Sequence, residues 1–335
     1  MYDYSKKLLK FYGDEVAIDS SARSQLREHR RTNEGRLKDG LAENNGPKVS
    51  RFQIQGGYAM HTVVQHPKND YDIDNGVIFA AGDLVGPKGA DISALDARKM
   101  VRDAVDDGAF KTPPVVKPNC VRVFYEKGHH VDLPVYREKQ GLLGNKYLEI
   151  ASADWKRSDP AGVNAWFENQ VGRSPDKDND RQFRRIVTYL KALGKSRDSW
   201  NAPSGFMFSI LVSECYVSDA RDDISLIKTL RKIEARLKTN LKVKHPVVDE
   251  YVTDGDDDPR TRFFRDKVGD LLSDLAVLDS SDCDEAKAAS AWDKFFRTEY
   301  FTKRVKEAAS AIGLTSIVTS SSPIRTIRDG ERRYG

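Results

Sequence analysis

The chain has 335 residues, 39% hydrophobic and 32% charged, and its 55 basic and 51 acidic side chains leave a net charge of +4. This length predicts about two domains, and the hydrophobic fraction is enough for a sizeable core. Periodic hydrophobic segments recur along the chain and exclude disorder over most of its length. The hydrophobic runs are too short to span a membrane, and the mild net charge does not indicate a protein that binds duplex nucleic acid.

We expect no signal peptide at residues 1–4, because no hydrophobic run follows a basic region there. The three cysteines (Cys120, Cys215 and Cys283) are odd in number and lack metal-binding spacing. We interpret them as reduced thiols and expect a cytoplasmic protein with no membrane association.

The first half of the chain mixes predicted helices and strands. Helices are expected over 4–12, 20–43 and 92–106, and strands over 51–55, 71–79, 119–126, 130–135 and 147–150. The strands on either side of Lys127-Gly128 form a predicted hairpin. Five arginines lie within 23–37, which is typical of a solvated helix face, or of a wall that faces phosphate if the helix flanks an active site.

The second half is predicted to be helical. Hydrophobic residues repeat at helical spacing over 183–193, 224–237 and 264–278, and each stripe is interpreted as core. Prolines and aspartates interrupt the pattern within 152–180. We therefore predict an α+β fold with a catalytic lobe built on a mixed sheet (1–165), an all-α lobe (166–315) and a C-terminal tail (316–335).

The sharpest local feature is Asp72-Ile73-Asp74, which lies on a predicted strand. Side chains two apart on a strand share a face, and two carboxylates on one face repel each other unless a cation lies between them. Asp132 lies between hydrophobic residues of a later strand, where it also needs a partner. Three such carboxylates can hold two divalent ions for nucleotidyl transfer. Taken alone, the Asp72–Asp74 pair fits a solvated strand edge as well.

Gly56-Gly57, Asp72-Ile73-Asp74 and Asp132 together resemble the core of the polymerase-β-like nucleotidyltransferases. The segments Asp70–Gly76 and His130–Pro134 resemble one branch, the bacterial cGAS/DncV-like nucleotidyltransferases (CD-NTases), which make cyclic oligonucleotide messengers in anti-phage signalling. The resemblance extends over nearly the whole chain. Its second-half segments are Asp154-Trp155, Ser158-Asp159-Pro160, Tyr189-Leu190-Lys191, Pro203-Ser204-Gly205 and His245-Pro246-Val247.

The resemblance implies that Asp72, Asp74 and Asp132 are the catalytic and metal-binding residues, with two Mg²⁺ ions, or Mn²⁺ in their place. It also implies that Gly56 and Gly57 bind the triphosphate of ATP or GTP. The family has serine where this chain has Gly57, so Thr62 is a candidate to supply the missing hydroxyl.

Two residues of the second half are assigned to the triphosphate by resemblance, namely Lys191 and Ser204. From composition alone, Lys191 is a solvated lysine, and Ser204 is the N-cap of the helix predicted over 206–212. Arg122 alternates with valines and either contacts a phosphate or lies on the surface. Tyr136 is interpreted as a core or rim aromatic, or as a platform for a base.

Two other groups of residues are interpreted without a metal. His129 and His130 lack a third ligand at zinc spacing and are taken as turn and strand residues. The aspartates at 254 and 256–258 are taken as a solvated acidic loop, because the glycine and glutamate of a calcium loop are out of register.

The resemblance implies a synthase that makes a cyclic oligonucleotide without a stable nucleic-acid template, with a purine cyclic dinucleotide of the cGAMP type as the favoured product. A linear oligonucleotide synthase and an inactive nucleotide-binding scaffold remain the alternatives. Some members of the resembled family are conjugated through their C-terminus by an E1-like partner, so Gly335 is a candidate attachment point.

Overall fold

The computed structural model describes residues 1–65, 71–86, 89–126, 128–141, 143–178 and 180–320, with side chains as far as residue 311. Asp70, Lys127 and Gly335, which entered the predictions above, lie outside these residues. The predicted division into lobes over 1–165 and 166–315 and a tail over 316–335 stays a prediction. The described residues form two compact units, one over Asp3–Ser273 and one that joins Met1–Tyr2 to the segment starting at Asp274.

The elements of the first unit run in this order: α1 (Ser5–Phe11), the short π-helix η1 (Tyr12–Val16), α2 (Ser20–Glu43), β1 (Arg51–Gln55), α3 (Gly56–Ala59), β2 (Asp72–Ala80), η2 (Ala81–Asp83), α4 (Ala94–Val105), β3 (Val115–Val116), β4 (Val121–Phe124), β5 (His130–Leu133), β6 (Val135–Gln140), β7 (Lys146–Ala151), β8 (Trp155–Ser158), α5 (Pro160–Val171), α6 (Gln182–Lys195), α7 (Gly205–Cys215), α8 (Asp222–Thr239) and α9 (Pro259–Asp274). The second unit contains η3 (Ala276–Asp279), α10 (Glu285–Phe296) and α11 (Tyr300–Ser320).

The strands form one mixed sheet centred on β2, in the order β3-β4-β5-β2-β6-β7-β8, with β1 paired to β2. β1 runs antiparallel to β2, whereas β5 and β6 run parallel to successive halves of it. The single strand predicted over 130–135 is wrong in one respect, because the chain breaks into β5 and β6 at Pro134. Proline has no N–H to give to the ladder, and the Pro134 carbonyl instead accepts from the Val77 amide at 2.8 Å.

Two strands were not predicted. β3 has only two residues, and β8 contains Trp155, Lys156, Arg157 and Ser158, without the alternation that marks a strand. β8 exists because it pairs antiparallel with β7, from Leu148↔Ser158 to Ala151↔Trp155. The tertiary pairing thus determines the structure of a segment whose own sequence is neutral.

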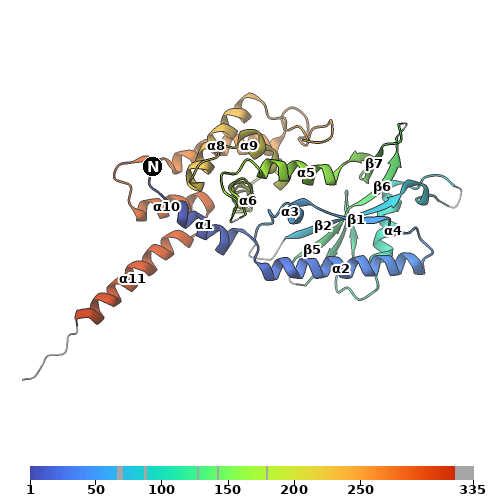
Figure 1. Ribbon diagram of the computed structural model, residues 1–335, viewed down its shortest axis with the longest axis horizontal. Coiled ribbons are helices and arrows are strands. Elements are labelled where there is room, and N and C mark those ends of the chain that lie inside the picture. The colour runs from blue at the N-terminus through green and yellow to red at the C-terminus, as the bar shows by residue number, and fades with distance from the viewer. Residues whose placement is uncertain (66–70, 87–88, 127, 142, 179, 321–335) are drawn as a thin grey trace, which may run out of the picture. The chain divides into compact units, whose positions relative to one another are not determined.

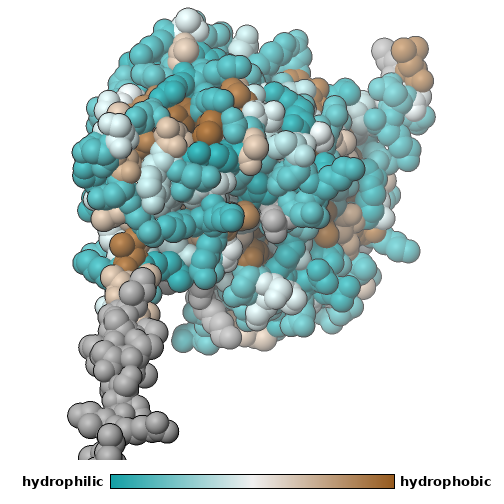
Figure 2. Space-filling model, turned by 60° about the vertical axis from the view of Figure 1, so that its left-hand side comes forward, coloured by the Kyte–Doolittle hydropathy of each residue, from teal (hydrophilic) through white to brown (hydrophobic). Residues whose placement is uncertain are grey.

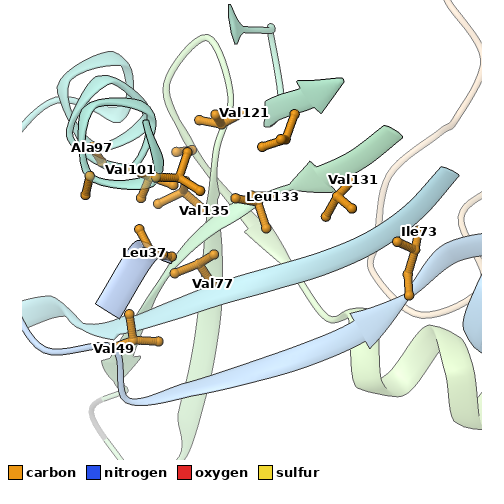
Figure 3. Packing of buried hydrophobic residues seen from close by; sticks show 14 of the residues in the cluster. Leu37, Val49, Ile73, Val77, Ala97, Val101, Val121, Val131, Leu133 and Val135 are labelled. Carbon is orange, nitrogen blue, oxygen red and sulfur yellow. The ribbon is translucent and has the colours of Figure 1, made fainter. Parts of the chain in front are cut away.

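The hydrophobic core around the sheet lies between one of its faces and two helices, α2 and α4 (Figures 1 and 3). Ile73 and Val77 of β2 and Val131 of β5 are completely buried in it. Leu37 of α2 and Val101 of α4 pack against the same cluster. Because neighbouring residues of a strand face opposite ways, Asp72, Asp74 and Asp132 face the other side of the sheet.

The helices that follow the sheet have the predicted hydrophobic stripes. Phe183, Ile186, Val187, Leu190 and Leu193 of α6 are all completely buried, so this stripe is core. The side of the molecule drawn in Figure 2 is mainly hydrophilic, with hydrophobic residues scattered over it. Among the described residues, no helix is long and hydrophobic enough to cross a membrane.

Candidate active site

Two parallel strands bring four polar side chains together on one face of the sheet. The register pairs Asp72 with His130 and Asp74 with Asp132. Asp72 and Asp74 are two apart on β2, and His130 and Asp132 are two apart on β5, so all four share a face. One ligand atom each from Asp72, His130 and Asp132 lies within 4.8 Å of the others.

The pKa values of the two carboxylates on β2 are shifted in opposite directions. Burial, and then the charges of Asp72 and Asp132, raise the pKa of Asp74 well above its ordinary value. For Asp72, burial acts in the same direction, but its interactions with His130, Lys195 and Arg122 together outweigh burial, and the pKa of this carboxyl is lowered. Like charges this close need a compensating cation.

Arg122 supplies part of that compensation. It lies on β4 directly across from Asp132, and its Nε and Nη2 donate to the two carboxylate oxygens at 2.8 and 2.7 Å. The sequence predicted a phosphate contact or a surface position for Arg122. In the structure its guanidinium binds Asp132, and its role toward a nucleotide stays a prediction.

Gly56 allows β1 to turn into α3 beside Asp74. Its φ is +66°, in the left-handed region, and a Cβ at this position would lie 2.0 Å from Asp74 Oδ2. Only glycine satisfies both conditions. Gly57 is different, because its φ is ordinary and the nearest atom to an added Cβ is 3.5 Å away.

Lys191 faces the carboxylates from α6. Its Nζ donates to Thr62 Oγ1 at 2.6 Å, and burial lowers the pKa of this lysine to about 8, although Asp72 acts to raise it. The interpretation from composition, a solvated lysine, is therefore wrong. The hydroxyl of Thr62 is buried against Lys191, so the two residues singled out separately in the sequence form one pair.

One cavity of about 480 Å³ joins these groups, all of which belong to the first unit. Its charged lining residues include Asp72, Asp74 and Lys191. Of the predicted site residues, the cavity is lined by Gly56, Gly57, Thr62, Asp72, Asp74, Lys191 and Ser204. Asp132 and Arg122 are not among the lining residues and reach the site through the strand pairing instead.

Two further predictions concern Ser204 and Tyr136. Ser204 caps α7, since its Oγ accepts from the Met207 amide at 3.2 Å, as the local sequence predicted. Tyr136 is 1% exposed, and its hydroxyl donates to Gln55 Oε1 at 3.0 Å, so it belongs to the core.

The structure adds residues that sequence reasoning missed. His130 was taken as a strand residue only, although its position two before Asp132 on one strand could have placed it at the site. Lys195 lies one helical turn beyond Lys191 and lines the same cavity; spacing of four on a helix is the signal for it. Trp200 also lines the cavity from an irregular loop, where no periodicity marks it.

The residues present fit a divalent metal ion. Three carboxylates and an imidazole converge, and the raised pKa of Asp74, which burial and then Asp72 and Asp132 cause, reflects negative charge that a dication would relieve. Oxygen ligands of this kind are those that Mg²⁺ binds beside phosphates. Asp72, Asp74 and Asp132 are the residues that would hold it.

The fold and the site define a nucleotidyltransferase. Residues 50–136 match the family model described as "Cyclic GMP-AMP synthase DncV-like, nucleotidyltransferase domain". These residues therefore form a nucleotidyltransferase domain similar to that of DncV, which confirms the resemblance drawn from the sequence.

Solved structures share the fold over most of the chain. Bradyrhizobium diazoefficiens CdnG, a CD-NTase in complex with GTP, is 14% identical with a TM-score of 0.68, over 91% of this chain and 98% of CdnG. Escherichia coli DncV, bound to 3′-deoxy GTP, is 14% identical with a TM-score of 0.67, over 88% of this chain and 96% of that one. Escherichia coli CdnC with ATP is 15% identical with a TM-score of 0.62, over 88% and 98%. The predicted two-lobed α+β fold is confirmed.

Proposed function

We propose that this protein is a cyclic oligonucleotide synthase that joins purine nucleoside triphosphates, ATP and GTP, into a cyclic dinucleotide of the cGAMP type. The observation that carries the proposal is the meeting of Asp72 and Asp74 with Lys191 in one cavity. Carboxylates on one wall and an amine on the other suit a metal-bound triphosphate. Solved structures of the same fold contain GTP or ATP, which supports the choice of substrate.

The chain's own residues have distinct roles in this proposal. Lys191, Ser204 and the backbone of Gly56 and Gly57 bind the triphosphate of the donor nucleotide. Thr62 orients Lys191 through the hydrogen bond between them. Arg122 either keeps its bond to Asp132 or turns to a phosphate when the nucleotide binds.

The reaction itself is a substitution at phosphorus. A ribose hydroxyl of the acceptor attacks the α-phosphorus of the donor, its proton passes to Asp132, and the bond from the α-phosphorus to the leaving pyrophosphate breaks. Two Mg²⁺ ions, or Mn²⁺, would supply charge neutralisation of the triphosphate when bound by Asp72, Asp74 and Asp132. A second substitution on the linear intermediate closes the ring.

The resemblance extends the proposal beyond the reaction. We propose that the protein works without a stable nucleic-acid template, in the cytoplasm and in anti-phage signalling. Conjugation through Gly335 by an E1-like partner belongs to the same proposal, although Gly335 lies outside the described residues.

The test is incubation of the full chain with the four labelled nucleoside triphosphates and Mg²⁺ or Mn²⁺. Phosphatase treatment, chromatography and mass spectrometry then identify the product. We expect a small product that resists phosphatase. A ladder of products would indicate a linear synthase instead, and no turnover with either ion would indicate an inactive scaffold.

A double variant, Asp72→Asn with Asp74→Asn, tests the site. We expect product formation to fall at least about a thousandfold, about 4 kcal/mol of transition-state stabilisation, with the fold intact. The matched control is Asp83→Asn, an exposed carboxylate just beyond β2, which should retain activity. Undiminished product from the well-folded double variant would remove this carboxylate pair from the reaction.

A further inference from the structure

The carboxylate cluster contains a histidine that the proposed reaction does not use. We propose that His130 is a nitrogen ligand to a divalent ion that Asp72 and Asp132 also bind, and that this position therefore takes Mn²⁺ in preference to Mg²⁺. The inference rests on the proposed function and deepens it, because it names the class of ion at the same site.

The strand register places His130 for this role. It lies opposite Asp72 across the β2–β5 pair, and its Nε2 is 3.6 Å from Asp72 Oδ2. Two ligand atoms at about 2.1 Å from one ion are about 3.0 Å apart at right angles and about 4.2 Å apart when opposite. The distance observed between Asp72 and His130 lies between these limits. Asp132 contributes the third atom of a set whose members lie within 4.8 Å of one another, so the side chains would have to close slightly around an ion.

The imidazole of His130 also lies in a buried environment. His130 is 5% exposed, and its backbone amide donates to the Tyr71 carbonyl at 3.2 Å. On β4, the ring of Phe124 lies 6.5 Å from that of His130, centre to centre. A side chain with little freedom loses little entropy when it binds an ion, so the position is preorganised.

Arg122 does not close this position. It occupies both oxygens of Asp132, but a carboxylate has about four lone-pair sites, and two remain for an ion. Its positive charge also partly balances the negative charge of Asp132 and of Asp74, which lies across from Asp132 in the strand register. An ion can thus share Asp132 with the guanidinium.

The ligand chemistry determines which ion is favoured. Mg²⁺ prefers shells of oxygen alone and gives up its water reluctantly. Imidazole nitrogen favours transition-metal ions. Such ions bind a site of mixed nitrogen and oxygen ligands more tightly than Mg²⁺ does. One histidine among carboxylates therefore shifts the preference toward Mn²⁺, which still accepts the carboxylate oxygens.

The experiment is a titration of the full chain with Mn²⁺ in the absence of nucleotide, followed by electron spin resonance. The loss of the free-ion signal gives the affinity, and spin-echo modulation detects a coordinated ¹⁴N nucleus. We expect ¹⁴N modulation that changes to the ¹⁵N pattern when the protein is labelled with ¹⁵N-histidine. This measurement uses the unaltered chain, so it does not depend on the folding of a variant.

A variant measures the preference. We expect His130→Leu to abolish the nitrogen modulation and to weaken Mn²⁺ binding at least about tenfold, whereas Mg²⁺ binding changes by less than about threefold. The control is His61→Asn, an exposed histidine at a φ of 56°, which asparagine tolerates.

The outcomes separate the inference from the function on which it rests. If Mn²⁺ binds without nitrogen modulation, His130 only orients Asp72, and the inference is overturned while the proposed function stands. If neither Mn²⁺ nor Mg²⁺ binds, with or without nucleoside triphosphate, both fail. Equal loss of Mn²⁺ and Mg²⁺ binding in a folded His130→Leu also overturns the proposed preference.

Discussion

The charged residues at the site come from two sides. The strand wall consists of Asp72 and Asp74 of β2 with their partners on β5, and the helix wall consists of Lys191 and Lys195 of α6. On the strand wall, backbone pairing sets Asp72 beside His130 and Asp74 beside Asp132, and the positions follow from the register alone. On the helix wall, Lys191 reaches the site along a flexible side chain that Thr62 orients through one hydrogen bond. Activity should therefore be sensitive to backbone changes near the strand wall. Nucleotide affinity should be sensitive to the loss of charge on the helix wall.

The largest effect is expected from the glycine turn beside the strand wall. Gly56→Ala should lower activity at least about a hundredfold, because its Cβ would displace the Asp74 carboxylate and its φ is unfavourable for alanine. Gly57→Ala is the matched control: it keeps the backbone N–H proposed to bind the triphosphate, its Cβ has room, and it should keep most of the activity. The measurement is product formation together with the melting temperature Tm. Equal activity of the two variants would show that the turn does not position Asp74.

On the helix wall, Lys191→Met should weaken binding of a nucleoside triphosphate about 10- to 100-fold, the value of a hydrogen bond to a charged group. Lys195→Met should have a smaller effect, about threefold, because Lys195 is exposed and solvent screens its charge. Calorimetric titration measures both. Lys232→Met, an exposed lysine of α8, is the control. An unchanged affinity in Lys191→Met would return Lys191 to a structural role.

The same wall should respond to pH. Since burial lowers the pKa of Lys191 to about 8, the ammonium loses its charge as the pH rises from 7 to 9. Triphosphate affinity should therefore fall about threefold or more over this range, beyond any change in the Lys191→Met variant. Parallel titrations of the two proteins test this. If the affinity of both proteins falls equally as the pH rises, a group other than Lys191 causes the change.

The strand wall should be more stable without its charge. The pKa of Asp74 is raised in the folded protein, so its ionised form opposes folding, and stability is lost as the pH rises through that pKa. At pH 7 with chelator, Asp74→Asn should raise Tm by about 2–4 °C for each kcal/mol gained. A lower Tm in the variant would mean that the carboxylate makes bonds that outweigh the repulsion.

The smallest effect is expected at the cap of α7. Ser204→Ala removes the acceptor for the Met207 amide and should lower the free energy of unfolding by about 1 kcal/mol, whereas Ser204→Gly should lower it by only a few tenths. Chemical denaturation measures both variants. Weaker nucleotide binding by both variants, at equal stability, would favour the triphosphate role of Ser204 over the cap alone.

The site residues of the strand wall were easier to predict from the sequence than those of the helix wall. The alternation of Asp72, Ile73 and Asp74 predicts which side chains share a face, because a strand has a period of two. The same rule would have included His130, had it been applied to β5 as it was to β2.

The helix wall was harder to predict. Lys191 donates to Thr62, which lies 129 residues away in the sequence, and no local pattern encodes that contact. Trp200 lies in a loop, where no period exists. The strand β8 was missed for a related reason, since only its pairing with β7 makes it a strand.

The division of β2 between core and site has a consequence for how the chain tolerates insertions and deletions. Ile73 is completely buried against the helices, while its neighbours Asp72 and Asp74 face the site. Removing one residue from β2 would turn hydrophobic side chains toward the cavity and carboxylates into the core. Changes of length in this strand should therefore abolish folding and activity together, and only substitutions can separate the two.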